Sequence, residues 1–201
     1  MATDGNIRAT QAAAVPRYEA KIEISVQAQD YWPLASLATG VGDANWEYEN
    51  LSRKFSWNTV AEILEEEKQL LKEWFAEGYD AVSDLMCFGM ETWPADCHVD
   101  LGTAGAVAAL NAAGCPTFTA CNGECKEDRP LVGFSARAKH VPLLVEAAKE
   151  AGVGLIPTPE GWLLVYSDRA DGLHGFAQKM AARSPEWTAL RKRRAVRRGA
   201  Q

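Results

Sequence analysis

Several residues of this chain have side chains that could carry out chemistry. They are Cys97, His98, Asp100, Cys121, Cys125, Asp168 and His174. A thiol beside an imidazole and a carboxylate is the combination that nucleophilic thiol catalysis requires, because the imidazole generates the thiolate and the carboxylate orients the imidazole. Thiols and histidines are also the preferred ligands of zinc. The residue types therefore indicate either thiol chemistry or a metal site.

We expect Cys121 to be the nucleophile if the chain is an enzyme. His98 or His174 would act as the base and Asp100 would orient it. A zinc site would instead use Cys121, Cys125 and one histidine, although the spacing of the cysteines is not that of a zinc finger. Redox exchange between Cys121 and Cys125 is a third alternative, so the cofactor stays open between zinc and none.

The same region is also predicted to bind a ligand, which does not require it to be catalytic. Thr103 can cap a helix that follows Asp100-Leu-Gly, and free backbone N–H groups at a helix start bind anions. The connection from Cys121 to Pro130 is long for two paired strands, and excess loop length is typical of functional loops. We expect a small, anionic molecule to bind there, contacted by Thr103, Asn122, Gly123, Arg129 and Asp168.

The elements that must position these residues follow from hydrophobic spacing and from Gly and Pro signals. Helices are predicted over 59–77, 103–113, 139–151, 172–183 and 185–198. Strands are predicted over 17–27, 115–121, 131–137, 153–157 and 162–167. This order predicts an α+β fold, a two-layer sandwich of a mostly antiparallel sheet with helices on one face.

Chain direction then predicts which residues meet. A helix and a strand joined by a tight turn run antiparallel, so alternate connections return to the same end of the domain. This places the following residues at one end: His98, Asp100, Thr103, Cys121, Asn122, Cys125, Arg129, Asp168 and His174. His140 is expected at the opposite end. Cys87 and Cys115 are expected in the core, and Cys115 is too far along its strand, about 20 Å from Cys121, to share a metal with it.

Length and composition favour one soluble domain. The chain has 201 residues, 47% hydrophobic and 24% charged, which excludes a disordered or disulfide-stapled miniprotein. We expect a disordered leader over 1–16, a single α+β domain over 17–190 and a basic C-terminal tail over 191–201. Five cysteines, an odd number, and the lack of an apolar N-terminal run favour the reducing cytoplasm.

The charge is distributed unevenly. Six of the 21 basic residues lie between Arg191 and Arg198 and no acid follows Glu186, so Met1–Leu190 holds 15 bases against 27 acids, a net charge of −12. An acidic body repels nucleic acid, which we therefore do not expect as a partner. It suits a non-enzymatic interaction or immunity-type protein that binds a basic protein partner, with some of the seven tryptophans as anchors.

One part of the chain resembles a known family. Asp100–Gly123, which contains Gly-Thr-Ala, Leu-Asn-Ala-Ala-Gly-Cys-Pro-Thr-Phe and Cys-Asn-Gly, resembles a segment of a bacterial family of proteins of about this length, as do 130–134 and 140–144. The resemblance covers about a third of the chain. It implies that the Cys-Asn-Gly turn is a hallmark of the family and implies no particular activity. The residues discussed above predict a cytoplasmic protein that binds a small molecule, with a Cys/His polar site on the 121–130 loop as its catalytic site if it is an enzyme.

Overall fold

The computed structural model describes residues 17, 20–26, 55–77, 99–123, 129–159 and 161–198. Its elements follow the predicted order closely. They are α1 (Trp57–Glu77), α2 (Ala104–Ala113), β1 (Thr117–Cys121), β2 (Leu131–Phe134), the 3-10 turn η4 (Ala138–His140), α3 (Val141–Ala151), β3 (Gly154–Pro157), β4 (Leu163–Tyr166), α4 (Gly172–Ala182) and α5 (Ser184–Arg198). The α+β class is confirmed.

The four strands form one antiparallel sheet in the order β1-β2-β4-β3. Within it, Val132 of β2 pairs with Val165 of β4, which in turn pairs with Leu155 of β3. All three side chains are fully buried and face the helices. Strands β3 and β4 pair antiparallel, and the Thr-Pro-Glu-Gly sequence between them is typical of a hairpin connection.

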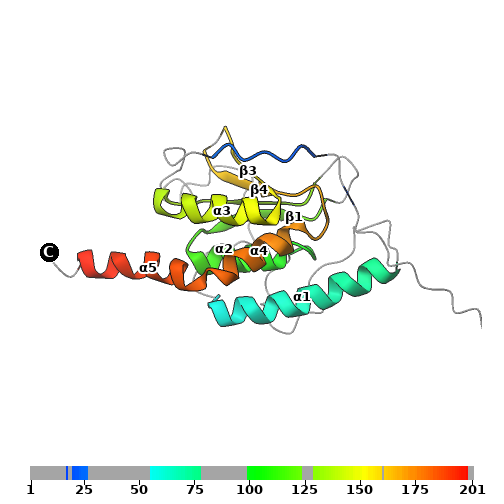
Figure 1. The fold of residues 1–201 in the computed structure, drawn as a ribbon, viewed down its shortest axis with the longest axis horizontal. Helices are drawn as coiled ribbons and strands as arrows, with labels where there is room; N and C mark the ends of the chain where they lie inside the picture. Colours follow the sequence, from blue (N-terminus) through cyan, green and yellow to red (C-terminus); the bar gives the residue numbers. More distant parts are fainter. Residues whose placement is uncertain are drawn as a thin grey trace, which may run out of the picture.

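The helices lie on one side of the sheet, as expected. Helices α2, α3 and α4 pack together beneath it, and α1 packs on α2 and α4 on the side away from the sheet (Figure 1). Helix α1 therefore forms a further layer outside the predicted two-layer sandwich. Helix α2 is buried at all ten positions because it lies among the sheet, α1 and α4. Its Ala-rich sequence, apolar on every side, is typical of such a surrounded helix.

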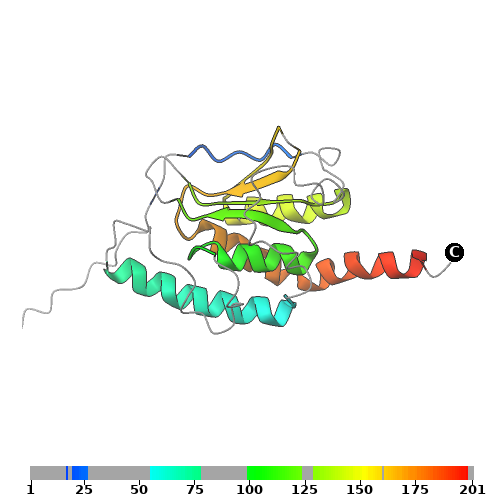
Figure 2. The same ribbon diagram turned by 180° about the vertical axis from the view of Figure 1, so that it is seen from behind.

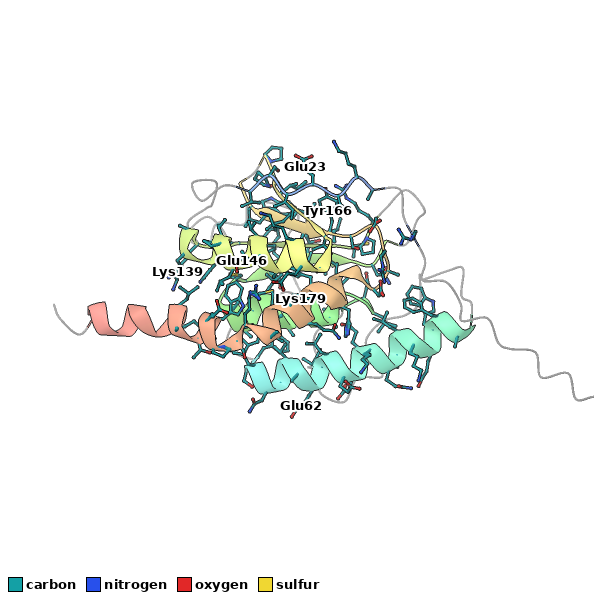
Figure 3. All side chains as sticks on the ribbon, in the orientation of Figure 1. Glu23, Glu62, Lys139, Glu146, Tyr166 and Lys179 are labelled. Atoms are coloured by element: carbon teal, nitrogen blue, oxygen red, sulfur yellow. The ribbon has the colours of Figure 1, made fainter. Side chains whose placement is uncertain are left out.

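The predicted strand over 17–27 is present in part. Residues 20–26 run parallel to β3: the Ser25 N–H donates to the Leu155 carbonyl at 3.1 Å, and the Leu155 N–H donates to the Glu23 carbonyl at 2.8 Å. The hydroxyl of Tyr166 donates to the Lys21 carbonyl at 2.8 Å and accepts the Glu23 N–H at 3.1 Å. The segment thus borders the sheet, where Figure 2 shows it beside β3 and Figure 3 labels Glu23 and Tyr166.

Candidate functional site at the start of helix α2

The predicted convergence of polar residues is seen at the start of α2. The Asn122 N–H, just after β1, donates to Oδ2 of Asp100 at 3.1 Å. The Thr103 hydroxyl donates to the Asp100 carbonyl at 2.8 Å. These bonds place Asp100, Thr103 and Asn122 at one end of the domain, as chain direction requires.

Glu67 of α1 is the central residue of this end, although it was not among the site residues expected from the sequence. Its side chain is 0% exposed. Its Oε1 accepts the Gly102 N–H at 3.1 Å, and its Oε2 accepts the Gly105 N–H at 3.2 Å. The same Oε2 lies 2.7 Å from Nδ1 of His174 on α4. A buried carboxylate thus joins α1 to the start of α2 and to α4.

Two glycines allow this approach. Gly102 has φ of +90°, and a Cβ there would lie 2.9 Å from the Ala170 carbonyl oxygen. At Gly105 a Cβ would lie only 2.6 Å from Oε2 of Glu67, closer than Cβ contacts in real proteins. Gly105 therefore leaves room for the carboxylate, and Gly102 for the nearby Ala170 carbonyl, so that Glu67 meets both N–H groups at the positive end of the helix dipole.

This arrangement corrects the expected role of the helix start. We expected Thr103 and the free N–H groups of α2 to bind an external anion. Glu67 of the same chain occupies that position, and Thr103 is fully buried with its hydroxyl on Asp100. The Gly102 and Gly105 N–H groups already serve this internal carboxylate and are therefore not offered to a ligand.

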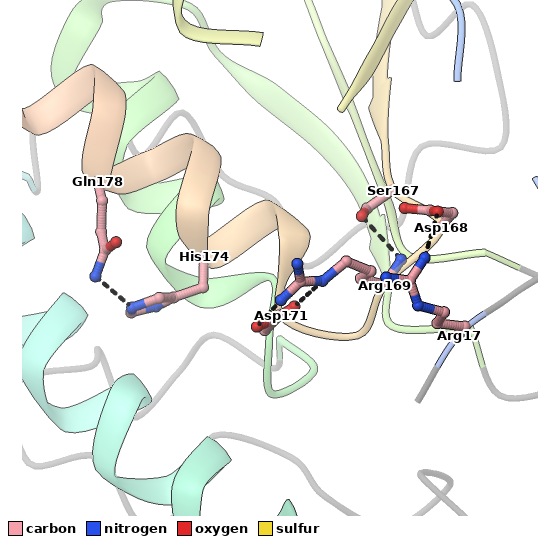
Figure 4. Close-up of polar contacts among 7 residues, drawn as sticks. All are labelled: Arg17, Ser167, Asp168, Arg169, Asp171, His174 and Gln178. Carbon is pink, nitrogen blue, oxygen red and sulfur yellow. Dashed lines mark hydrogen bonds and ion pairs between the residues drawn. The ribbon is translucent and has the colours of Figure 1, made fainter. Parts of the chain in front are cut away.

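His174 uses both of its ring nitrogens in this network. Beyond the contact of Nδ1 with Glu67, its Nε2 lies 3.0 Å from the amide nitrogen of Gln178, one turn further along α4 (Figure 4). An ionised carboxylate only accepts and an amide NH₂ only donates, so the consistent assignment has the proton on Nδ1 and the lone pair on Nε2. The His174 side chain is 8% exposed, whereas Gln178 is exposed. The Nε2 lone pair of His174 is therefore directed toward the surface, where the side chain of Gln178 covers it.

The structure does not bring Cys121 to His174. A bulge at Phe118 shifts the register between Thr117 and Thr119, so that Ala120 faces the helices and Cys121 faces the other side of the sheet. The described partner of Cys121 is the Gly123 N–H, which donates to its Sγ at 3.4 Å. The other expected base, His98, and Cys125 lie outside the described residues, so a Cys121–His98 pair stays a prediction.

Arg129 and Asp168 lie at the same end but have partners of their own. The Arg129 guanidinium stacks 3.8 Å above the Tyr166 ring, and Asp168 forms a 3.6 Å ion pair with Arg17. Beside them Arg169 binds Asp171 with two hydrogen bonds, which raise the pKa of the guanidinium (Figure 4). The remaining predicted contact residue, Gly123, is buried with φ of +83° and shapes the turn after β1.

A second Cys/His pair lies at the opposite end, where His140 was expected. Sγ of Cys115 is 3.3 Å from Nδ1 of His140, and the Trp187 ring is 6.0 Å from the imidazole. Burial raises the pKa of the Cys115 thiol to about 12. Burial, with the nearby cations Lys139, Arg137 and Arg191, lowers the pKa of His140 to about 4. Both groups are neutral near pH 7, so this pair is structural rather than an activated thiolate.

In the part of the chain that the structure describes, no three His, Cys, Asp or Glu side chains are grouped as metal ligands. The zinc set of Cys121, Cys125 and a histidine reaches beyond that part and stays untested. None of the helices described here is long and apolar enough to cross a bilayer.

The signal for Glu67 was present in the sequence. Val60, Ile63, Leu64, Leu71 and Trp74 are buried at helical spacing, and position 67 falls on the same face. Its neighbours Glu65, Glu66 and Lys68 made the stretch resemble a solvated charged face. A charged residue in phase with an apolar stripe indicates a buried, bonded carboxylate.

Comparisons with protein-family models, with curated proteins and with solved structures return no match for the chain.

Proposed function

We propose that this protein binds a small molecule at the α2 end and that His174, held by Glu67, exchanges a proton with it. The observation that supports this is the 2.7 Å contact between the fully buried Glu67 carboxylate and Nδ1 of His174. A carboxylate at Nδ1 fixes the tautomer, directs the Nε2 lone pair outward and stabilises the imidazolium that forms when Nε2 takes a proton.

Gln178 is the expected point of entry. Its exposed side chain occupies the position at Nε2 that a ligand hydroxyl, thiol or bound water would take. A ligand that displaces the Gln178 amide must present a hydrogen-bond donor, because Nε2 of His174 accepts one hydrogen bond in this tautomer. The substrate class is therefore a small protic molecule or an ester or amide attacked by water. Its charge is left open, since Glu67 fills the expected anion position.

The reducing cytoplasm remains our proposed location. Cys115 and Cys121 are free thiols in the structure, as expected for a protein kept in a reducing compartment. A non-enzymatic protein that binds a basic partner is the alternative. The outer side of α1 gives it little support, since Lys68 and Lys72 lie among its exposed glutamates and Lys68 binds Glu65 at 3.2 Å.

Hydrolysis of p-nitrophenyl acetate tests the proton-transfer proposal without knowledge of the natural ligand. His174 would remove a proton from the water that attacks the ester carbonyl, which releases acetate and p-nitrophenol. We expect the protein to exceed the same concentration of N-acetylhistidine, and His174→Gln to lose this excess. Gln178→Ala should raise the rate because it uncovers Nε2.

His140→Gln is the matched control because His140 is buried at the opposite end. It should keep the rate, provided that circular dichroism shows a folded protein. Loss of the rate in Cys121→Ala with retention in His174→Gln would transfer the chemistry to the thiol and contradict the proposal. An equal rate in wild-type and His174→Gln would mean that the Glu67–His174 contact only joins helices.

A further inference from the structure

The C-terminal half of α5 has the densest charge in the chain. Arg191, Lys192, Arg193, Arg194, Arg197 and Arg198 fall within eight positions, and no acid follows Glu186. Helix α5 continues through all of them and ends at Arg198. Like charges at neighbouring positions of a helix repel one another, and an anionic partner would relieve that repulsion.

The first half of α5 is attached to the rest of the fold. Trp187 is fully buried and lies beside His140, and the Arg191 guanidinium donates to the Ala112 carbonyl of α2 at 2.7 Å. Lys139 donates to the Leu190 carbonyl. Beyond this attachment the helix extends past the other elements, as both views show (Figures 1 and 2).

The basic positions surround the helix axis. At about 100° per residue, the six positions from 191 to 198 fall on every side, and only Ala195 and Val196 between them are uncharged. Such a segment has no apolar stripe with which to pack on a domain or to insert into a membrane surface. It fits a polyanion that approaches from any direction.

The acidic body does not prevent such a contact. Arg198 lies about 10 Å further along the axis than Arg191 at about 1.5 Å per residue, which exceeds the Debye length of about 8 Å at physiological ionic strength. The charge of −12 that disfavoured nucleic acid in the sequence belongs to Met1–Leu190. The tertiary arrangement thus separates the outer end of the basic segment from much of that charge.

We propose that α5, from Arg191 onward, binds the phosphate backbone of a nucleic acid. Six positive charges within about 10 Å of helix match the dense phosphates of a nucleic acid, where duplex DNA carries one charge per about 1.7 Å. Contacts of this kind are made to phosphates and are independent of base sequence. The inference does not depend on the proton-transfer site, which lies at the other end of α2.

Fluorescence anisotropy with a short labelled DNA duplex and an RNA strand of the same length tests it on the full chain. The logarithm of the binding constant for the duplex should fall linearly with the logarithm of salt concentration, with a slope of up to about −4.5 if the five charges beyond Arg191 contact phosphates. The test variant replaces the five basic residues at positions 192, 193, 194, 197 and 198 by glutamine. It keeps Arg191, because the Arg191 guanidinium donates to the Ala112 carbonyl. It should weaken binding at least about tenfold and flatten the slope.

The matched control removes five charges elsewhere. It replaces the exposed lysines Lys21, Lys68, Lys72, Lys149 and Lys179 by glutamine. Retention of affinity in this control, with loss in the α5 variant, supports the proposal. Equal weakening of both variants, no binding of either nucleic acid at low salt, or equally effective competition by poly-glutamate would overturn it. Circular dichroism and thermal unfolding check that both variants are folded.

Discussion

The Glu67 carboxylate and Nδ1 of His174 lie 2.7 Å apart although 107 positions separate the two residues in the chain. Glu67 also accepts N–H groups of Gly102 and Gly105, so one carboxylate joins α1, the start of α2 and α4. Transfer of a carboxylate from water to the protein interior costs free energy. The three hydrogen bonds of Glu67, together with the positive end of the α2 dipole, offset that cost. The contact therefore has both a structural consequence and a chemical one, and these can be measured separately.

Glu67→Gln should lower the free energy of unfolding by about 2–4 kcal/mol. The amide keeps the shape of the carboxylate but loses the charge, and its NH₂ group faces donors rather than acceptors. Urea denaturation near neutral pH measures the change. Glu62→Gln is the matched control on the exposed side of α1, where Figure 3 shows Glu62 pointing away from the body, and it should change stability by less than about 0.5 kcal/mol. A similar small effect at Glu67 would mean that its buried contacts add no net stability.

Gly105→Ala should destabilise the protein although alanine is the better helix former. Its Cβ would lie 2.6 Å from Oε2 of Glu67 and 2.7 Å from Cδ2 of Leu64, so the carboxylate must move away from the helix start. Overpacking of this kind costs about 1–3 kcal/mol. Gly175→Ala in α4 is the control: nothing lies within 4 Å of its Cβ, and it should stabilise by up to about 1 kcal/mol. Opposite signs of the two changes in thermal unfolding would confirm the close approach.

Acid should weaken the fold through His140. The folded protein holds the pKa of His140 at about 4 against 6.5 for an ordinary histidine, because burial and then Lys139, Arg137 and Arg191 disfavour the imidazolium. Between these pH values the unfolded chain binds a proton that the folded one does not. Stability is therefore highest above about pH 6.5 and falls as the pH approaches 4, by about 3 kcal/mol from this residue.

Urea midpoints of wild-type and His140→Gln across this range measure the effect. The variant should start lower near pH 7, because the Cys115 thiol and the Arg137 N–H lose Nδ1 as a partner. Its further loss on acidification should be smaller than that of the wild-type. Parallel curves for the two proteins would show that His140 is not the residue that titrates.

The two described cysteines should differ widely in reactivity. Burial raises the pKa of the Cys115 thiol from 9.0 to about 12, so its thiolate fraction at mildly alkaline pH is about a thousandfold below that of an ordinary thiol. Cys121 is only half-buried, on the sheet face away from the helices. Iodoacetamide labelling followed by peptide mass spectrometry should modify Cys121 first and Cys115 only on unfolding. Early modification of Cys115 would show that the opposite end of the domain opens readily.

Much of this fold was predictable from the sequence because its signals are local. Gly114 and Gly152 end α2 and α3 with left-handed backbone, and the apolar spacing of Val141, Leu144 and Ala148 fixes the buried face of α3. Short turns then determined chain direction, which placed Asp100, Thr103, Asn122 and His174 at one end and His140 at the other.

The tertiary structure decided which of these residues touch. The bulge at Phe118 moves Cys121 to the far side of the sheet, since one inserted residue reverses the alternation of a strand. Only the packing of α1 against α2 and α4 brings Glu67 to the helix start and to His174. Periodicity specifies which face of an element is buried, whereas a contact between distant elements depends on how those faces pack together. The sequence therefore determined at which end of the domain the site residues lie. The tertiary structure determined which of them are in contact.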